Sequence, residues 1–375
     1  MSTKLIPTTL AAVLLGSTAV ADVPSVAVDI APLHSLVARV MEGVGTPDLV
    51  IPASASPHGY RLRPSEARAL QNADVVFWMG EDMTPWLEGA IETLAENASV
   101  TALLEHQETM LLEFREGALF EGHDHDGHGE DHDEHGHDDH DKDHDEHAHD
   151  DHDKDHDEHG HDDHDEHAHD EHGKDHDEHA HDDHDEDHDE HAHDDHDEDH
   201  DEHGHGAHDP HAWLSPDNAR AWMNVIAAEL SAADPENAGT YFANAAAGRA
   251  ELEELKDEIS VLLEPVRSVS FVVFHDAYQY FESAFDISAS GAISLSDAAD
   301  PSPARIAEIQ ARVKNEGIGC VLSEPQYNPG IIAVVMDGTD ATTSVLDPLG
   351  SDLETGANLY PQLLRNLATS LASCM

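Results

Sequence analysis

The sequence is poor in basic residues, with 17 Lys and Arg against 81 Asp and Glu, and its formal net charge is −64. Nucleic-acid recognition needs a basic face that neutralises phosphates, so a nucleic-acid partner is excluded. The same charge argues against docking on an anionic membrane surface. Most of the acidic excess lies in one tract: the 86 residues 123–208 hold 30 His, 41 Asp and Glu, and three Lys. We expect the rest of the chain to be an ordinary acidic globular protein.

Long apolar runs are missing beyond the N-terminus, where Lys4 precedes a mostly apolar stretch, residues 5–20. Ala19-Val20-Ala21 matches the A-x-A cleavage site of a secretory signal, which predicts a signal peptide over 1–21 and Asp22 as the first mature residue. The alternative is a short membrane anchor, but Pro7-Thr8-Thr9 interrupts the run, which falls short of about 20 residues. No Cys lies near the cleavage site, so we expect no lipid anchor and an exported, soluble protein.

Cysteine is scarce as well, with Cys320 and Cys374 the two in the sequence. An even count in an exported chain predicts one disulfide between them. The alternative is a pair of buried free thiols.

Common catalytic motifs are absent. None of the 35 His is followed by Glu, so the sequence has no H-E-x-x-H metalloprotease motif. It also lacks a G-x-S-x-G elbow and a P-loop. We therefore expect a protein that is not an enzyme.

What the sequence does contain is an alternation of short β-branched strands and amphipathic helices, which indicates an α/β fold with largely parallel sheets. Expected strands are 25–30, 48–51, 74–78, 268–274, 318–322 and 342–346, and expected helices are 33–42, 64–70, 85–97, 216–232, 236–263, 303–317 and 358–373. The helix over 236–263 is long enough, at about 1.5 Å per residue, to join two lobes and keep their relative movement small. The predicted division is a signal peptide (1–21), an N-terminal lobe (22–234), a linking helix (235–264) and a C-terminal lobe (265–375).

The His/Asp tract is an insertion in the first lobe, which we place at 122–208. It repeats with a period of 12, in near copies of H-D-D-H-D-x-D-H-D-E-H-A/G such as 137–148 and 149–160. The repeat has no large apolar residue, so stacked copies would bury nothing, and we expect a disordered loop. Its imidazoles and carboxylates favour low-affinity zinc collection; a solvated charged linker is the alternative.

Three isolated histidines, His58, His211 and His275, stand where chemistry is expected. His58 and His275 follow predicted strands, and Asp347 follows another; ligands of open α/β sheets bind outside the carboxyl ends of strands. Three imidazoles and a carboxylate make a good tetrahedral set for Zn²⁺. Taken one at a time, each histidine could instead be a hydrogen-bonded strand-end residue, and Asp347 could cap a helix.

The motifs around these residues resemble those of the ZnuA/TroA-like solute-binding proteins of bacterial metal ABC importers, most closely the zinc-binding ZnuA branch. The matching segments, in the family's order, are Pro57-His58-Gly59-Tyr60, His211-Ala212-Trp213-Leu214-Ser215-Pro216, Phe274-His275-Asp276-Ala277-Tyr278, Ser323-Glu324-Pro325-Gln326 and Leu346-Asp347-Pro348-Leu349-Gly350. They cover nearly the whole mature chain outside the tract. The family also has an acidic His-rich insert between its first and second ligands.

The resemblance implies a periplasmic protein that binds zinc tightly in a cleft between two lobes, through His58, His211 and His275. It implies delivery of Zn²⁺ to the membrane permease of an ABC importer, with periplasmic zinc chaperones as further candidate partners and a monomeric state. Some zinc-binding relatives have Glu before the first His, where this chain has Pro57. The fourth ligand is therefore either Asp347 or water.

Other residues were weighed against these. His34 is expected to face the cleft or solvent at the start of a helix, and His106 to lie on the surface. Glu324 is either a partner of a ligand or a carboxylate preceding a helix. Two rival functions remain at this stage: a hydrolytic zinc centre with water in its fourth position, and an exported metal store that acts through the tract alone.

Overall fold

The computed structural model describes residues 23–115, 120, 208–294 and 301–374, which all belong to one compact unit. The first half of the described chain forms a four-stranded parallel sheet with strand order β2-β1-β3-β4. Its strands are β1 (Val26–Val28), β2 (Asp48–Leu49), β3 (Val75–Trp78) and β4 (Ser99–Ala102). Its helices are α1 (Ala31–Val40), α2 (Pro64–Asn72) and α3 (Pro85–Leu94), with a 3-10 turn η1 (Pro57–Gly59) after β2.

A second four-stranded parallel sheet follows, with strand order β6-β5-β7-β8. Its strands are β5 (Phe271–His275), β6 (Ala292–Ser294), β7 (Cys320–Ser323) and β8 (Thr342–Val345). Its helices are α6 (Gln279–Phe285), α7 (Pro303–Glu316), α8 (Pro329–Met336) and α9 (Leu359–Cys374). The predicted α/β class with two parallel sheets is confirmed.

Strand β5 shows why the sheet forms where it does. All five of its residues are buried, as expected for a central strand of a parallel sheet covered on both faces. Phe271 and Val273 point into the main core, whereas Val272 and Phe274 join a smaller core with residues of α7 and α8. His275 is the last residue of the strand and therefore lies at its carboxyl end, where ligands of parallel sheets bind.

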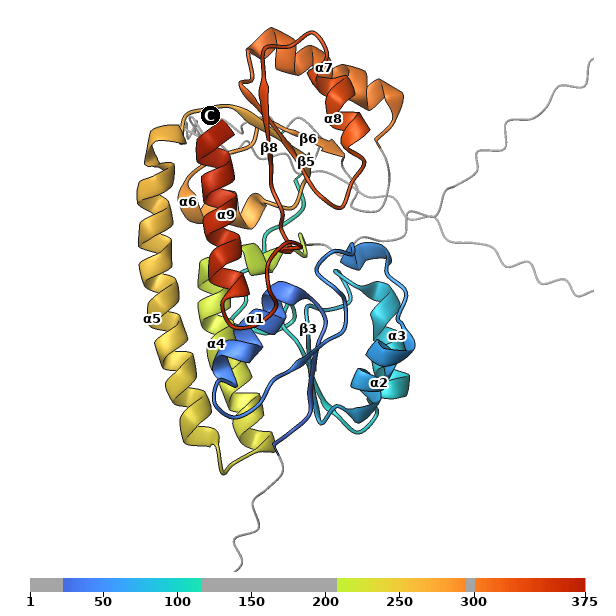
Figure 1. Cartoon of the computed structure of the whole chain (residues 1–375), viewed down its shortest axis with the longest axis vertical. Coiled ribbons are helices and arrows are strands. Elements are labelled where there is room, and N and C mark those ends of the chain that lie inside the picture. Colours follow the sequence, from blue (N-terminus) through green and yellow to red (C-terminus); the bar gives the residue numbers. More distant parts are fainter. Residues whose placement is uncertain (1–22, 116–119, 121–207, 295–300, 375) are drawn as a thin grey trace, which may run out of the picture. The chain divides into compact units, whose positions relative to one another are not determined.

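Along the sequence, the strands of the two sheets are separated by a 3-10 turn η2 (Ala212–Leu214), the helices α4 (Pro216–Ala233) and α5 (Ala238–Leu263), and a short turn η3 (Glu264–Val266). The 26-residue helix α5 buries one residue every three or four positions, at Tyr241, Ala245, Gly248, Leu252, Leu255, Ile259 and Leu263. It packs along α4 and also contacts α1, α6 and α9 (Figure 1). The sequence pattern predicted this helix to within two residues of its start.

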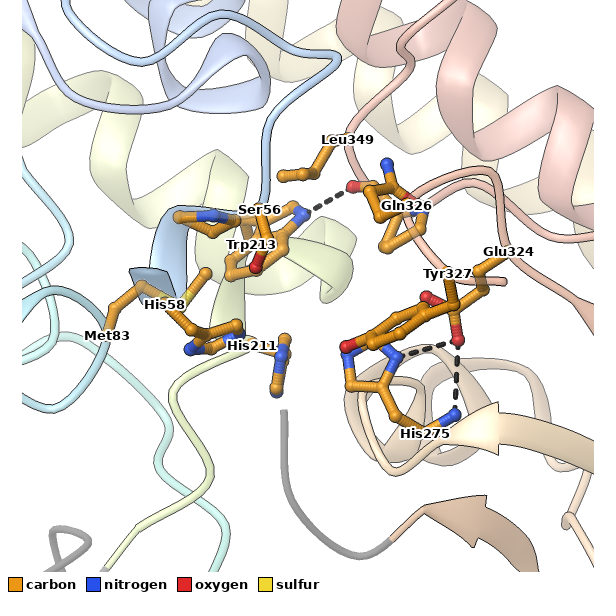
Figure 2. Close-up of a pocket in the computed structure, with 12 residues that line it drawn as sticks. Ser56, His58, Met83, His211, Trp213, His275, Glu324, Gln326, Tyr327 and Leu349 are labelled. Carbon is orange, nitrogen blue, oxygen red and sulfur yellow. Dashed lines mark hydrogen bonds and ion pairs between the residues drawn. The ribbon is translucent and has the colours of Figure 1, made fainter. Parts of the chain in front are cut away.

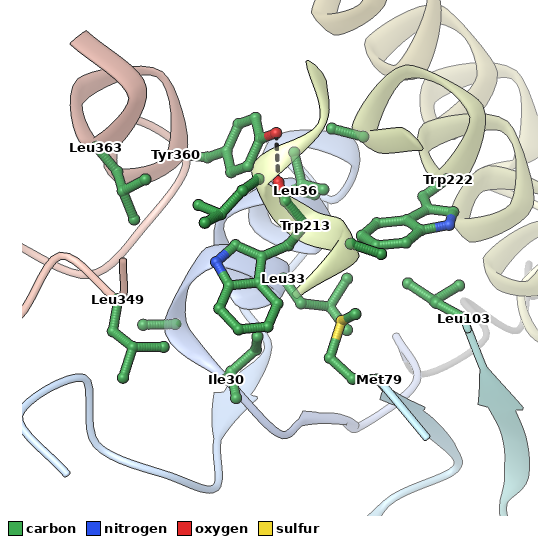
Figure 3. Close-up of a cluster of buried hydrophobic side chains, with 14 of the residues drawn as sticks. Ile30, Leu33, Leu36, Met79, Leu103, Trp213, Trp222, Leu349, Tyr360 and Leu363 are labelled. Atoms are coloured by element: carbon green, nitrogen blue, oxygen red, sulfur yellow. Dashed lines mark hydrogen bonds between the residues drawn. The ribbon is translucent and has the colours of Figure 1, made fainter. Parts of the chain in front are cut away.

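The main hydrophobic core is continuous from the first sheet to the second. Trp213 and Trp222, on η2 and α4, lie among residues of α1, and Tyr360 of α9 donates its hydroxyl to the carbonyl of Trp213 at 2.7 Å (Figure 3). The indole N–H of Trp213 also donates to the carbonyl of Pro348, which follows β8, at 2.9 Å. The two sheets therefore share buried aromatic packing.

The predicted disulfide is present. Cys320, at the start of β7, and Cys374, the last residue of α9, are bonded with Cα atoms 5.6 Å apart. Both residues are buried, so the bond fastens the C-terminal end of α9 to the second sheet.

The predicted signal peptide (1–21) and residues 122–207 of the His/Asp tract lie outside the described residues. Within the described part of the chain, no helix is long and apolar enough to cross a membrane.

One buried carboxylate predicts how stability changes with pH. Asp29, directly after β1, accepts hydrogen bonds from the backbone N–H groups of Ile30 at 2.6 Å and Met79 at 2.7 Å, and so joins the carboxyl ends of β1 and β3. Burial raises the pKa of Asp29 to about 7, against the lowering effect of these bonds. Between about pH 4 and pH 7 the folded state therefore binds a proton that the unfolded state has lost, and stability falls as pH rises.

We expect the free energy of unfolding of the natural protein, relative to that of Asp29→Asn, to decrease by up to about 4 kcal/mol from pH 4 to pH 7. Urea unfolding of both metal-free proteins across this range measures the difference. Parallel pH profiles for the two proteins would contradict this role of Asp29.

Candidate metal centre

Three histidines predicted from the sequence meet at one point (Figure 2). A nitrogen of His58, one of His211 and one of His275 all lie within 4.8 Å of one another, and their ring centroids are 5.3–6.5 Å apart. Among the described residues, this is the one cluster of at least three potential metal-ligating side chains. A tetrahedral zinc ion with Zn–N bonds of about 2.0–2.1 Å needs nitrogens about 3.3 Å apart. Small inward movements of the rings therefore suffice to complete a zinc site.

His58 is presented by the turn η1, just beyond the edge strand β2. Pro57 occupies the first position of this turn, where its fixed φ angle is favourable, and its carbonyl accepts the indole N–H of Trp86 at 2.7 Å. Pro57 therefore shapes the turn that presents His58. The His58 ring is half-buried.

His211 is oriented by a carboxylate two residues before it. Asp209 accepts hydrogen bonds from the backbone N–H of His211 at 2.9 Å and from its ring Nδ1 at 2.7 Å. A carboxylate accepts, so Nδ1 carries the proton and Nε2 presents its lone pair to a metal. Both side chains are 1% exposed. The sequence motif did not single out Asp209, although its spacing in Asp209-Pro210-His211 allows the contact.

His275 is held in the same way from a neighbouring strand. Glu324, just after β7, accepts from the backbone N–H of His275 at 3.2 Å and from its Nδ1 at 2.7 Å (Figure 2). Of the two sequence interpretations of Glu324, the partner of a ligand is therefore the one that the structure supports. Two of the three histidines thus have carboxylate partners that fix the same tautomer.

The cavity around the histidines is largely apolar. Its lining includes Met83, Trp213, Tyr327, Pro348 and Leu349. Tyr327 is tilted against the His275 ring, with centroids 5.4 Å apart, and Trp213 lies 5.2 Å from the His211 ring. Such a lining limits the access of water and strengthens the electrostatic attraction between a bound cation and its ligands.

Asp347 is not brought into the histidine cluster. Its carboxylate accepts backbone N–H groups of Leu349, Gly350 and Ser351, and also the hydroxyl of Ser351. The amide of Gln326 donates to it as well, at 3.1 Å. The residue organises the loop after β8 in this conformation, and it would have to leave these donors in order to reach a metal.

The two remaining histidines that we weighed lie elsewhere. We expected His34 to face the cleft or solvent, and this was wrong. His34 is 5% exposed, and its Nε2 bonds the carbonyl of Pro47 at 3.0 Å, away from the cavity. Burial lowers the pKa of His34. His106 is half-buried, and its Nδ1 accepts the backbone N–H of Glu108.

The carboxylate partners yield a prediction. Glu324→Gln and Asp209→Asn keep the side-chain shape but remove the charge that stabilises the Nδ1–H tautomer, so each should weaken zinc binding about 10–100-fold. Asp234→Asn is the matched control, because Asp234 is equally buried but bonds Asn237 and Tyr241. Competition with a zinc chelator measures all three. Equal losses in the control and the two site variants would contradict the prediction.

Known proteins resemble this chain over nearly its whole length. The family model described as "ZnuA: Zinc-uptake complex component A periplasmic" matches residues 26–374. A "High-affinity zinc uptake system protein ZnuA" of Brucella abortus (strain 2308) is 41% identical over 360 residues, which cover 96% of this chain and 94% of the relative. A protein with the same description from Paracoccus denitrificans (strain Pd 1222) is 40% identical over 359 residues, covering 95% and 93%.

Solved structures share the fold. A crystal structure of ZnuA superposes with a TM-score of 0.64 at 18% identity and covers 94% of this chain and 99% of its own. A zinc-bound ZnuA mutant that lacks its residues 138–173 gives a TM-score of 0.63 at 19% identity, covering 94% and 98%.

Proposed function

This chain belongs to the ZnuA family of zinc-uptake components, and from that premise we propose that it captures Zn²⁺ in the periplasm and delivers it to the membrane permease of an ABC importer. The observation that carries the proposal is the convergence of three imidazoles, two of them oriented by carboxylates, in an apolar cavity. This nitrogen-rich donor set suits Zn²⁺ better than Mn²⁺ or Mg²⁺.

Capture follows from how the ligands are distributed. His275 ends a strand of the second sheet, whereas His58 follows a strand of the first and His211 precedes α4, which packs on β3. A bound ion would therefore link the two sheets and favour the arrangement that brings its ligands closest. The permease can recognise that arrangement. The fourth ligand is either a water molecule or Asp347, and Asp347 could bind only after the loop that follows β8 rearranges.

We further propose that export removes residues 1–21 and leaves a protein without a lipid anchor. In this scheme, residues 122–208 form the inserted loop and act as an auxiliary, low-affinity zinc collector. Residues 235–264 join the lobes 22–234 and 265–375. The relatives are named for zinc uptake, which favours transport over the hydrolytic alternative.

Deletion of residues 122–206 tests the proposal, because His58, His211 and His275 all lie outside that span. We expect titration calorimetry with a competing chelator to show one tight zinc ion retained and several weaker ions lost. A metal store that acts through the tract alone would instead lose its tight zinc. Complete loss of tight binding in the folded deletion variant would refute the proposed site.

A further inference from the structure

A buried ion-pair cluster lies next to the histidine cluster and is not explained by metal ligation. Arg115 donates from its Nε to both carboxylate oxygens of Asp276, at 3.0 and 3.1 Å, and a second nitrogen also bonds Asp276. Its guanidinium further donates to Glu282 at 2.7 and 3.1 Å. The Arg115 side chain is 15% exposed, and those of Asp276 and Glu282 are 11% and 5% exposed. One planar fork thus binds carboxylates from two elements at once.

The cluster spans the two halves of the fold. Arg115 lies on the segment that leaves β4, whereas Asp276 follows β5 and Glu282 belongs to α6. The burial of Asp276 raises its pKa, the bonds from Arg115 oppose this rise, and the nearby charge of Asp209 adds to it. Burial alone would lower the pKa of Arg115, but the charge of Glu282 and the hydrogen bonds raise it above its ordinary value.

The same segment is fastened to the partner of His211. The hydroxyl of Tyr280, on α6, accepts the backbone N–H of Leu112 at 2.9 Å and donates to the carbonyl of Asp209 at 2.8 Å. The N–H of Asp209 donates to the carbonyl of Leu112, and Glu113 pairs with His208 in an antiparallel bridge. The residues on either side of the tract are therefore joined to each other and to α6.

His275 and His211 are each close in sequence to a residue of this hydrogen-bond network. Asp276 directly follows His275, and the N–H of Ala277 donates back to the carbonyl of His275 at 3.0 Å in a tight turn. Asp209 precedes His211 by two residues and bonds its ring. A displacement of Asp276 would therefore move the backbone that carries His275.

We propose that Arg115 is a positioning residue for the metal site: by binding Asp276 and Glu282, its guanidinium holds His275 in the cluster with His58 and His211, from which small ring movements complete a zinc site. Because an ion needs all three nitrogens at once, fixing one strand end relative to the other two ligands prepares the site in advance. Arg115 acts through Asp276 and makes no contact with the ion itself.

The test compares Arg115→Met and Arg115→Lys in the full mature chain. Met keeps an apolar stem but leaves two carboxylates without their cation, and Lys keeps the charge but loses the bidentate fork. We expect about tenfold faster release of tightly bound zinc to an excess of chelator for R115M, with R115K intermediate between it and the natural protein. Stopped-flow measurement of the slowest release phase reports this rate, and thermal unfolding of the metal-free proteins is recorded in parallel.

Arg39→Met is the matched control. Arg39 is also 15% exposed and bonds two carboxylates, those of Glu251 and Glu42, without touching residues that hold the histidines. R39M should lower the unfolding temperature and leave zinc release within twofold of the natural rate. Equal acceleration in R39M and R115M, or natural release rates in R115M, would overturn the positioning role. Should R115M fail to fold, a natural release rate in R115K decides against it in the same way.

Because this inference rests on the proposed zinc site, His58→Ala identifies which release phase belongs to the histidine cluster. If H58A leaves every phase unchanged, the proposed function fails. If H58A removes the slow phase and R115M does not change it, the zinc site stands and the role of Arg115 fails.

Discussion

His275→Ala is expected to reduce tight zinc affinity by on the order of 10²–10³. Structural four-ligand zinc sites bind with about 10–16 kcal/mol, so one ligand accounts for roughly 2.5–4 kcal/mol, and every 1.4 kcal/mol is tenfold. His275 is 4% exposed at the end of β5, and its replacement by Ala removes one of the three ligand nitrogens. Chelator competition on the protein without residues 122–206 measures the loss and avoids the tract histidines.

The same variant should change how binding depends on pH. An ordinary imidazole has a pKa near 6.5, so below about that pH protons compete with zinc for each ligand nitrogen. Affinity falls as pH falls, by up to about three decades per pH unit for three histidines and up to about two for H275A. Asp347→Ala should leave the slope nearly unchanged, because a carboxyl with a reference pKa of about 3.9 stays ionised in this range.

His106→Ala is the control for these measurements, since His106 lies outside the cluster. It should keep both the affinity and the slope. An affinity that stays constant between pH 7.5 and 5.5 in the protein without residues 122–206 would be incompatible with three histidine ligands.

Removing the disulfide should have the largest effect on stability. Cys320 and Cys374 close a loop with a sequence separation of 54 residues. In the chain-entropy model, such a cross-link stabilises the folded state by about 4 kcal/mol at 25 °C, because it restricts the unfolded chain. The double variant Cys320→Ala/Cys374→Ala should therefore lose about that much free energy of unfolding in guanidinium titrations.

Zinc binding offers an internal check on that result. Cys320 begins β7 and pairs with Phe271 at the start of β5, whereas His275 is the last residue of β5. Neither cysteine lines the histidine cavity, so the folded double variant should bind zinc with nearly natural affinity. A destabilisation below about 1 kcal/mol would show that the bond does little to restrict the unfolded state.

Much of the fold was predictable because its central strands are continuous apolar runs. Val75–Trp78 and Phe271–His275 are both completely buried, and their patterns indicated strands directly. The strand Ser99–Ala102 was missed, because it lies at the edge of its sheet with two exposed residues and carries little apolar signal. Helix Pro329–Met336 was missed for the opposite reason: its apolar residues follow one another without helical spacing.

The site was predictable only in part. Motif resemblance identified His58, His211 and His275, and the structure brings these three side chains together in one cluster. Neither spacing nor composition could indicate that Glu324 reaches His275, because the contact joins residues 49 positions apart on different strands. Arg115 was likewise beyond sequence reasoning, since its partners lie more than 160 residues away.

The shared aromatic core has a consequence for the order in which a metal ion loses its ligands. Swinging the sheets apart would expose Trp213, and an aromatic side chain buries about 150–250 Å², which corresponds to about 4–6 kcal/mol. Such an opening is rarely populated, so exchange should proceed by stepwise substitution at the accessible edge. His58 is half-buried on a three-residue turn, whereas His211 and His275 are almost completely buried and each is held by a carboxylate. His58 should therefore be the first ligand replaced, and an incoming ligand, whether a chelator or a permease side chain, should enter from its side.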